Sequence, residues 1–490
     1  MNTRFKFVDL FAGCGGLSLG FRAAGGEEVL AVEKSPMAAE TYYSNLVSRI
    51  PSESSCQPTV FEQLLHQSGK HLKSHGSDDT SLIVDDIWNV LKCEKTILDQ
   101  LKRQNLDIVA GGPPCQGFSM AGLRKGASDA RNSLVNAFYQ FVIQTQPRAV
   151  VMENVDGIRK RFDDDKPAPI DEVVKLLEQG KKDKKSTYSV QRLLLNAQHY
   201  GIPQHRPRVI LIGIRSDIAA ESDLQFTDDF LRSGNDDTTT QNRTLLPPTV
   251  RENFKLADAI GDMHFGANGN AFLKSIKRLD TFLNKPISAN PLLENHVYRK
   301  HGDKVISRFL LYHALHQLND PLYPESLLQQ AIFDQVPEKH DAEELVRKSA
   351  SVEDLFEQLT NESIPLLKSI AGKEIPLSFK SASELKNHLE DNLTKKHTQR
   401  VIDQAKPAPT MVTIPDDFVH YGEPRTLTVR EMARIQSFPD TFVFHGKETT
   451  GGKKRATEVP QYTQVGNAVP PLLARHIASH VLDILSSRSG

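Results

Sequence analysis

The sequence predicts an α/β fold in which helices cover both faces of a mixed, mostly parallel sheet. Residues 5–215 alternate short runs of β-branched and other apolar residues with helix-like segments, a pattern typical of parallel sheets. The alternation stops near residue 216 and returns near residue 406. We therefore expect a Rossmann-like domain that the C-terminal part of the chain completes, with a smaller domain inserted before that return.

Local apolar patterning predicts the individual elements. Strands are expected at 7–11, 29–33, 82–84, 107–110, 149–152 and 208–213. Helices are expected at 17–24, from about 36, at 428–435 and at 472–485. The resulting domains are 1–215, 216–405 and 406–490.

Several stretches carry no sheet or core signal. Residues 227–250 are polar and are expected to form a loop, and the charged stretches 159–166 and 181–185 are expected to be solvated loops. Residues 320–362 hold eleven acidic and three basic side chains, a net charge of −8. This segment has a helical period, and its charge predicts an outer, solvated face rather than a surface for DNA phosphates.

Composition limits the class of protein. The chain has 490 residues, a net charge of −1 and a mean hydropathy of −0.40, so any nucleic-acid surface must be local. We see no signal peptide and no apolar run of membrane-spanning length, and we expect a cytoplasmic protein without membrane contact. The four cysteines show neither metal-ligand nor disulfide spacing, so no metal is expected; they are Cys14, Cys56, Cys93 and Cys115.

The stretch 111–119, Gly-Gly-Pro-Pro-Cys-Gln-Gly-Phe-Ser, carries the strongest functional signal. Pro113 and Pro114 fix φ and lack amide donors, so they hold the thiol of Cys115 at a rigid exit from the strand at 107–110. A cysteine presented in this way is expected to be a nucleophile. The alternative is a small buried apolar residue, the usual state of a free cysteine.

The first strand ends in a glycine-rich turn that suits a nucleoside. Gly13 and Gly15 lie between this strand and a helix, where backbone can approach a ligand; a structural tight turn is the alternative. Glu33 ends the next strand and could accept hydrogen bonds from two ribose hydroxyls. Asp86 ends the third strand and could bind an adenine amino group, unless these acids are helix caps or surface charges. The turn lacks pyrophosphate spacing, so an adenosine without phosphates, as in S-adenosylmethionine, fits best.

Two further motifs follow the nucleophile. Glu153 comes directly after a buried strand, at the edge where ligands bind in open α/β sheets; a helix N-cap region is the alternative. Arg206 and Arg208 are two residues apart around Pro207, so both guanidiniums are expected on one side of the next strand's start. Such forked donors can bind a carbonyl or a phosphate, and exposed arginines are the alternative.

Taken together, the motifs resemble those of the DNA (cytosine-5)-methyltransferases, bacterial restriction-modification type, in order and spacing. The resemblance covers 7–215 and about 406–480. It rests on DLFAGCGG at 9–16, GPPCQGFS at 112–119, ENV at 153–155, YGIPQHRPR at 200–208, REMARIQSFPD at 430–440 and QVGNAVPP at 464–471.

The resemblance implies an S-adenosylmethionine-dependent methyltransferase fold and a covalent mechanism. A methyl group would pass from S-adenosylmethionine to carbon 5 of a flipped-out cytosine in a specific duplex DNA sequence, leaving S-adenosylhomocysteine. Cys115 would be the nucleophile, Glu153 would contact ring nitrogen 3 and the amino group, and Arg208 would contact the carbonyl oxygen with support from Arg206. The implied cofactor-binding residues are Phe11, Gly13, Gly15, Glu33, Asp86, Ile87, Pro114 and Asn467.

At one position the chain departs from the family pattern. Lys34 stands where the family often has an aromatic residue that stacks on adenine, so Phe11 and Ile87 are expected to sandwich the base.

Duplex DNA is the implied partner of the whole chain. By resemblance, 1–215 holds the catalytic and cofactor sites, 216–405 is the target-recognition domain, and 406–490 contributes to the small domain and hinge before its last helix returns. Residues 117–134 are expected to form a lid over the flipped base. Candidate DNA contacts are Gln116, Ser119, Arg124, Lys125, Lys453, Lys454 and Arg455, with Arg299, Lys300, Lys304, Arg308 and 395–400 in the inserted domain.

Other functions remain open at this point. A tRNA cytosine-5 methyltransferase of the same fold is the first alternative, against which the long inserted domain argues. A silent DNA-binding or regulatory protein is the second, against which the intact Cys115, Glu153, Arg206 and Arg208 argue. We expect a monomer, with a cognate restriction endonuclease or defence-system protein as a possible companion. The segment 320–362 is a departure from a compact recognition domain and could pack elsewhere or meet a protein partner.

Overall fold

The structure is a computed structural model in which two compact units can be distinguished. It describes residues 5–48, 61, 70–73, 81–114, 132–161, 167–180, 187–234, 244–265, 270–283, 294–317, 380–384, 387, 399–452, 454 and 457–486. The first unit draws on Met1–Asn295, Ala405–Thr413 and Met432–Gly490, and the second on His296–Gln404 and Ile414–Glu431. The chain thus passes from one unit to the other four times.

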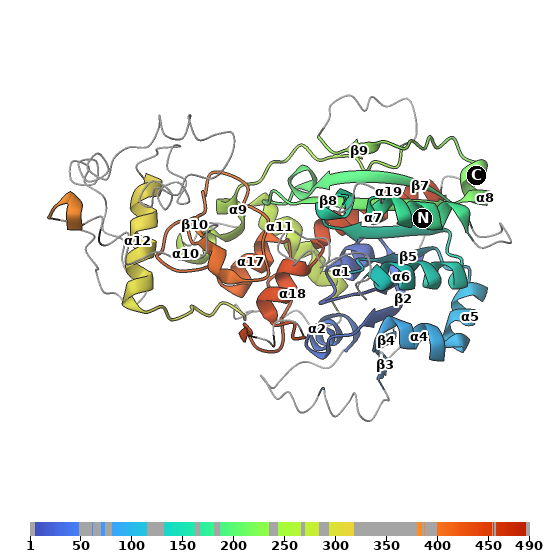
Figure 1. The fold of residues 1–490 in the computed structure, drawn as a ribbon, viewed down its shortest axis with the longest axis horizontal. Helices are drawn as coiled ribbons and strands as arrows, with labels where there is room; N and C mark the ends of the chain where they lie inside the picture. The colour runs from blue at the N-terminus through green and yellow to red at the C-terminus, as the bar shows by residue number, and fades with distance from the viewer. Residues whose placement is uncertain are drawn as a thin grey trace. The chain divides into compact units, whose positions relative to one another are not determined.

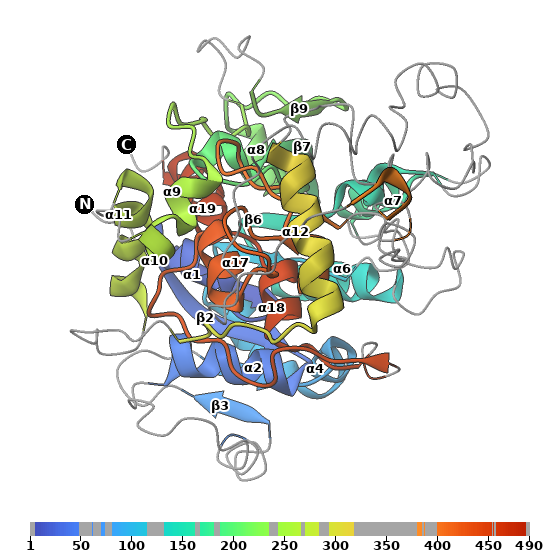
Figure 2. The same ribbon diagram turned by 90° about the vertical axis from the view of Figure 1, so that its left-hand side faces the viewer.

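A nine-stranded sheet organises the first unit, with β3 and β9 at its opposite edges (Figures 1 and 2). The strand order is β3-β4-β2-β1-β5-β6-β8-β7-β9. The strands from β4 to β6 run parallel, whereas β3 is antiparallel to β4, and β8 is antiparallel to both β6 and β7. The expected mixed, mostly parallel sheet is confirmed. The bounds are β1 Phe5–Leu10, β2 Gly26–Glu33, β3 His71–Lys73, β4 Ser81–Val84, β5 Ile108–Gly111, β6 Ala149–Asn154, β7 Tyr188–Asn196, β8 Pro207–Arg215 and β9 Phe230–Arg232.

Helices cover the two faces of this sheet because its strands are apolar on both sides. On β1, Val8 and Leu10 join the core that contains buried residues of α4 (Ile87–Cys93), α5 (Lys95–Arg103), α6 (Asn132–Thr145) and α7 (Pro169–Gln179). The alternate residue Phe7 packs on the other face, where its ring centroid lies 5.3 Å from that of Phe21 in α1 (Gly16–Ala23). Side chains that alternate along a strand therefore enter two separate cores.

The C-terminal helix α19 (Pro471–Ser486) packs closely against α1. The packing depends on glycine: a Cβ on Gly20 would lie 2.3 Å from the Pro471 carbonyl oxygen, and one on Gly16 would lie 2.3 Å from the Val469 carbonyl oxygen. Both distances are far below van der Waals contact, so larger residues would force the helices apart. This packing joins the last helix of the first unit to its first helix.

The remaining elements of the first unit are short. They are α2 (Pro36–Tyr42), the π-helix η1 (Tyr43–Val47), the 3-10 helices η2 (Asp156–Arg159), η3 (Ala197–Tyr200) and η4 (Arg278–Phe282), and the helices α8 (Ser216–Ala220), α9 (Leu256–Ile260), α10 (Asp262–Phe265), α11 (Ala271–Lys277) and α18 (Gln461–Asn467). Strands β3, β7 and β9 were not predicted, and β9 lies within 227–250, which was expected to be loop only.

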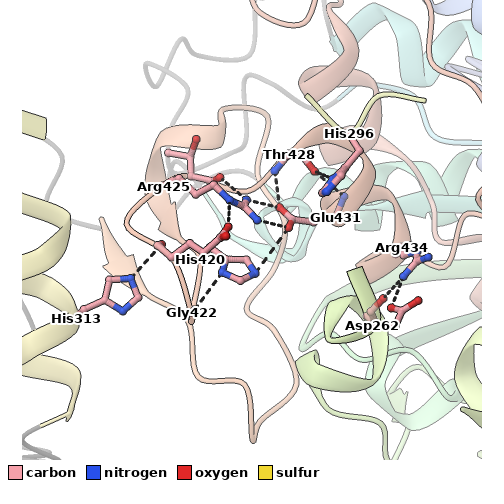
Figure 3. Close-up of polar contacts among 12 residues, drawn as sticks. Asp262, His296, His313, His420, Gly422, Arg425, Thr428, Glu431 and Arg434 are labelled. Carbon is pink, nitrogen blue, oxygen red and sulfur yellow. Dashed lines mark hydrogen bonds and ion pairs between the residues drawn. The ribbon is translucent and has the colours of Figure 1, made fainter. Parts of the chain in front are cut away.

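The second unit has a small apolar core and a buried ion pair. Helix α12 (Asp303–Gln317), β10 (Arg400–Val401) and β11 (Phe418–Val419) contribute the apolar residues. Beside them, Arg425 Nη2 lies 2.6 Å from Glu431 Oε1, and both side chains are fully buried (Figure 3). Thr428 N–H donates to Glu431 Oε2 (2.7 Å), and Glu431 N–H donates to Thr428 Oγ1 (3.2 Å). This reciprocal capping starts α17 (Val429–Ile435), as expected for 428–435.

Candidate active site

The candidate site lies at the edge of the large sheet that is formed by the carboxyl ends of its parallel strands. It lies next to β1, the strand from which the chain builds the sheet first in one direction and then in the other. From β1 the chain adds β2 and β4 on one side, and then β5 and β6 on the other. The segments that follow β1 and β5 therefore leave the sheet in opposite directions. Ligands bind at such a point in open α/β sheets. Because β8 is antiparallel to β6, the start of β8 lies at the same edge.

Glu153 and Arg208 meet at this edge. Glu153 is paired with Ile210 in the β6–β8 register, and Arg208 stands two residues before Ile210, so both side chains point to the same face. Arg208 Nε lies 2.9 Å from Glu153 Oε1, and Arg208 Nη1 donates to its neighbour's carbonyl, that of Pro207 (2.8 Å). Both residues are buried. Burial lowers the pKa of Arg208, and Glu153 opposes that shift.

The segment after β5 approaches the same carboxylate. A Cβ on Gly112 would lie 3.1 Å from Glu153 Oε2, so a side chain there would press on the carboxylate. Asn154 Nδ2 donates to the Pro113 carbonyl (3.0 Å), which ties the end of β6 to this segment. Pro114 is exposed and is the last residue described before a gap. Cys115 follows it directly in the sequence and lies outside the described residues, as do Gln116, Ser119, Arg124, Lys125 and all but the last three residues of 117–134.

Arg206 has different neighbours from Arg208. Its side chain is almost completely buried, and it donates to three backbone carbonyls: Nη1 to Met411 (3.2 Å), and Nη2 to Gly466 (2.9 Å) and Ala468 (3.0 Å). Burial, and next the charge of Arg208, lower the pKa of Arg206. The two arginines, which were expected on one side of the start of β8, therefore have different partners.

The first turn is shaped by backbone conformation and by Glu33. Phe11, Gly13 and Gly15 all have positive φ, of 60°, 56° and 99°. Gly13 N–H donates to Glu33 Oε2 (2.8 Å), and Ser35 N–H donates to Glu33 Oε1 (2.6 Å). A Cβ on Gly13 would meet no atom within 4 Å, so open space adjoins the turn. Burial raises the pKa of Glu33, and these backbone amides oppose that shift.

Asp86 and Ile87 follow β4 at the same edge. Asp86 caps α4 by accepting the Trp88 N–H (3.0 Å). Its other oxygen lies 2.9 Å from Lys34 Nζ, in an ion pair whose lysine is exposed. Burial raises the pKa of Asp86, but the hydrogen bonds from Lys34 and Trp88 outweigh this and the net shift is downward. Ile87 is buried in the sheet core, against which Phe11 also packs.

Asn467 is presented at the end of α18. It is exposed, whereas its neighbours Gly466 and Ala468 are buried. The carbonyls of these two neighbours are the ones that Arg206 binds. The sequence motif pointed to Asn467 but not to this support, because the partners are about 260 residues apart in the chain.

The sequence did not predict a buried polar cluster that joins β1, α1, β2 and α2. Ser18 Oγ lies 2.6 Å from Asp9 Oδ2 and 2.7 Å from Glu28 Oε1, and Tyr42 OH donates to Ser18 Oγ (2.8 Å). Arg22 Nη2 pairs with Glu28 (2.6 Å). Burial raises the pKa of Asp9 well above its usual value. Asp9 and Ser18 stand inside or beside the first motif, but only the fold reveals that Ser18 lies between Asp9 and Glu28.

The candidate DNA contacts are partly described. Lys454 is exposed in the first unit, while Lys453 and Arg455 lie outside the described residues. In the second unit Lys300, Lys304 and Arg400 are exposed. Arg299 Nη1 pairs with Asp416 Oδ1 (2.8 Å), and the Arg308 guanidinium lies 5.8 Å from the Phe309 ring centroid. Residues 395–398 and the acidic segment 320–362 are also outside the described part.

The part of the chain that the structure describes offers neither a metal-ligand cluster nor a membrane-spanning helix. Within that part of the chain, His, Cys, Asp and Glu side chains form no group of three or more that could hold a metal ion. In the same residues, no helix is both long enough and apolar enough to span a membrane.

Comparison with known proteins gives consistent matches. The family model for C-5 cytosine-specific DNA methylases matches residues 5–56 and 86–483. The Type II methyltransferase M.DdeI of Desulfomicrobium norvegicum is 28% identical over 487 residues, covering 97% of this chain and 88% of that protein. The Type II methyltransferase M1.HphI of Haemophilus parahaemolyticus is 28% identical, with 97% and 86% covered.

A solved structure matches the fold. It belongs to a provisionally assigned DNA modification methyltransferase encoded within an E. coli prophage, and it covers 98% of this chain and 99% of its own, with a TM-score of 0.50 and 21% identity.

Proposed function

Since the chain belongs to the C-5 cytosine-specific DNA methylases, we propose that it transfers a methyl group from S-adenosylmethionine to carbon 5 of a flipped-out cytosine in a specific duplex DNA sequence. The observation that carries the proposal is the Glu153–Arg208 pair, with 2.9 Å between Nε and Oε1, at the edge of the sheet where β5 leads into Cys115. A carboxylic acid, a guanidinium and a thiol are the groups that a cytosine ring needs for this reaction.

Cys115 is the proposed nucleophile. Carbon 5 of cytosine is a poor nucleophile, but addition of a thiolate to carbon 6 makes the ring enamine-like and places electron density on carbon 5. After carbon 5 has gained the methyl group, a base removes its proton, the carbon–sulfur bond breaks, and the thiolate leaves. A free thiol has a pKa of about 8.5, so positive charge near Cys115 would raise the thiolate fraction at neutral pH.

Glu153 and Arg208 have complementary roles in this proposal. Ring nitrogen 3 becomes more basic as sulfur adds, so a proton or hydrogen bond from Glu153 stabilises the charge that develops there. Arg208 has donors left beyond its contacts with Glu153 and Pro207, and these can bind the cytosine carbonyl oxygen. The ion pair orients both side chains before the base arrives, which reduces the cost of ordering them during the reaction.

The first turn fits an adenosine-containing cofactor. The sulfonium of S-adenosylmethionine supplies the electrophilic methyl group when this cofactor is bound. Glu33 uses one lone pair of each oxygen for a backbone N–H and has others for ribose hydroxyls. The open space at Gly13 admits a ligand against backbone. Phe11, Ile87, Asp86, Pro114 and Asn467 are the other proposed cofactor-binding residues.

Duplex DNA is the proposed substrate, and its cytosine must leave the base stack. Extruding a base costs a few kcal/mol, which phosphate contacts and closure of 117–134 would offset. Within 216–405, the exposed Lys300, Lys304 and Arg400 are proposed DNA contacts of a target-recognition domain, and Lys454 is one in the C-terminal part. A type II modification enzyme acting as a monomer in the bacterial cytoplasm, with or without a cognate endonuclease, is the corresponding cellular role.

A methyl-transfer assay with two substrates tests the proposal. The purified chain is incubated with labelled S-adenosylmethionine and either bacterial genomic DNA lacking methylation or total tRNA. We expect label in DNA only, and bisulfite sequencing of that DNA should map 5-methylcytosine to one short sequence. Label in tRNA only, or label at an exocyclic amino group, would overturn the proposed substrate or reaction.

A further inference from the structure

The sequence 405–413 forms a strap that belongs to the first unit although the chain on both sides of it belongs to the second. We call Ala405–Thr413 the 405–413 strap. It lies along the residues that lead into β8: His205 N–H donates to the Ala408 carbonyl (2.7 Å), and Ala408 N–H donates to the Pro203 carbonyl (2.8 Å). The strap is therefore fixed to the segment that ends in Arg208.

One strap residue is held by two buried side chains. Met411 N–H donates to Gln204 Oε1 (2.9 Å), and the Met411 carbonyl accepts from Arg206 Nη1 (3.2 Å). Gln204 Nε2 also donates to Gln436 Oε1 (2.9 Å), and Gln436 Nε2 donates to the Val465 carbonyl (2.8 Å). Gln204 and Gln436 are completely buried, so these amides depend on one another for partners.

The other end of the Arg206 guanidinium reaches the turn that carries Asn467. Nη2 donates to the carbonyls of Gly466 (2.9 Å) and Ala468 (3.0 Å), one on each side of Asn467. Arg206 is also fixed through its backbone, since its N–H donates to Asn196 Oδ1 (2.9 Å). A single guanidinium thus joins the start of β8, the strap and the Asn467 turn.

We propose that Arg206 is a positioning residue that holds the cytosine-binding Arg208 and the cofactor-binding Asn467 in register through the 405–413 strap. Its three side-chain hydrogen bonds go to backbone carbonyls, and it is almost completely buried, so its guanidinium is directed into the protein rather than toward substrate. This assignment rests on the proposed function, because Arg208 and Asn467 owe their roles to it.

Cofactor affinity separates this proposal from a direct contact between Arg206 and cytosine. The test compares Arg206→Lys with Arg208→Lys by calorimetric titration of S-adenosylhomocysteine without DNA, and by single-turnover methylation of duplex DNA. Lysine retains the charge but cannot reach three carbonyls in the fork geometry of arginine. We expect Arg206→Lys to weaken cofactor binding roughly tenfold, as expected for loss of hydrogen bonds to a charged group, and to slow methylation. Arg208→Lys should slow methylation with cofactor affinity unchanged.

Arg215→Lys is the matched control. Arg215 lies at the far end of the same strand, where Nη1 donates to the Gln146 carbonyl (3.0 Å) and Nε pairs with Asp217 (2.8 Å). Its replacement should alter neither cofactor affinity nor the methylation rate. If Arg206→Lys does not fold, Gln436→Met provides a milder loss of support for the same turn and should weaken cofactor binding while Arg206 is intact.

Unchanged cofactor affinity in folded Arg206→Lys, or in Gln436→Met where Arg206→Lys does not fold, would overturn the positioning role, even if methylation falls. A double replacement of Arg206 and Arg208 adds a second criterion. Non-additive losses of rate are expected if Arg206 acts through Arg208, and multiplying losses would contradict that. Failure of the wild-type chain to bind the cofactor or to methylate DNA would instead refute the proposed function.

Discussion

Arg208 Nε lies 2.9 Å from Glu153 Oε1 across the antiparallel junction of β6 and β8. The two residues are more than fifty positions apart in the sequence, and the reversal of strand direction brings them to one edge and one face of the sheet. Because both are buried, each depends on the other to compensate its charge.

Replacing Glu153 by Gln should abolish most methyl transfer while the fold is retained. Glutamine keeps the size of the side chain and can accept a hydrogen bond from Arg208, but it cannot protonate ring nitrogen 3. We expect a loss of about 10²- to 10⁴-fold in the single-turnover rate, the range for a removed acid–base group. The control is Glu27→Gln, an exposed position on β2, which should keep the wild-type rate. A Glu153→Gln rate within a factor of about three of the wild type would refute the acid role.

The geometry of the first turn predicts that replacing Gly13 or Gly15 by alanine lowers the free energy of unfolding by different amounts. Gly15 has φ 99°, and a Cβ there would lie 2.5 Å from Leu46 Cδ1. Gly13 has φ 56° and open space around that position. Gly15→Ala should therefore lower the free energy of unfolding by more than Gly13→Ala, whose cost is the backbone term of about 1 kcal/mol. Thermal unfolding of both variants measures the order, and equal losses would contradict it. Gly13→Ala should also weaken cofactor binding, because its methyl group would occupy the open space.

Asp9 should act as a neutral carboxylic acid. Ser18 Oγ lies within hydrogen-bond distance of both Asp9 and Glu28, and its single proton can serve only one of them. A protonated Asp9 can donate to Ser18, which then donates to Glu28. This arrangement agrees with the raised pKa that burial gives Asp9.

This protonation state has a testable consequence for stability. Since the folded pKa of Asp9 is raised, its contribution to stability is present below the unfolded pKa of about 3.9 and is lost as pH rises toward the folded value. Asp9→Asn keeps the neutral shape without the titration, so it should be at least as stable as the wild type at pH 8. Melting temperatures of both proteins between pH 5 and 8 test this. A large loss of stability in Asp9→Asn would show that the charged form is needed.

The second unit should lose stability in mild acid. Burial lowers the pKa of His301 and of His313 to about 4. His301 Nε2 faces the Thr426 N–H (3.5 Å) and must be unprotonated to accept from it. His313 Nε2 lies 3.1 Å from the Glu423 carbonyl oxygen (Figure 3). Both rings bind protons more weakly when folded. Their stability contribution is therefore present above pH 6.5 and is lost as pH falls toward 4.

His313→Gln tests this pH dependence. Glutamine can still donate to the Glu423 carbonyl, but it does not titrate, so the loss of stability between pH 7 and 5 should be smaller than in the wild type. Lys304→Gln, at an exposed position of the same helix, should leave the pH dependence unchanged. Unfolding followed by hydrogen exchange in 296–317 and 414–431 gives the readout. An unchanged slope in His313→Gln would contradict burial of a neutral histidine.

The large sheet could be predicted because its central strands are buried on both sides and therefore read as continuous apolar runs. Strand β7 was missed because it carries polar residues whose partners are remote in sequence. Gln191 is completely buried, and its amide binds the backbone of the segment that contains β9: Thr227 N–H donates to Oε1 (2.9 Å), and Nε2 donates to the Asp229 carbonyl (2.9 Å). A local pattern cannot anticipate such a pairing.

The same distinction applies to the site. Glu33, Asp86, Glu153 and Arg208 lie at or next to strand ends, so the topology of an α/β sheet predicts that they share an edge. The difference between the partners of Arg206 and those of Arg208 could not be predicted. It depends on the carbonyls of residues 411, 466 and 468, which only the folded chain brings to the Arg206 guanidinium. The Lys34–Asp86 ion pair could not be predicted from the sequence either, because β2 and β4 become neighbours only in the sheet.

The most direct measurement of the central claim is covalent trapping on a duplex whose target cytosine carries fluorine at carbon 5. Elimination requires removal of the carbon 5 hydrogen, and fluorine cannot leave in that way, so a thiolate adduct formed during methyl transfer should persist. We expect a denaturation-resistant protein–DNA complex that needs S-adenosylmethionine, whose cross-linked peptide contains Cys115, and that Cys115→Ala does not form. Methylation of ordinary DNA by Cys115→Ala, or a trapped complex through another residue, would contradict the account.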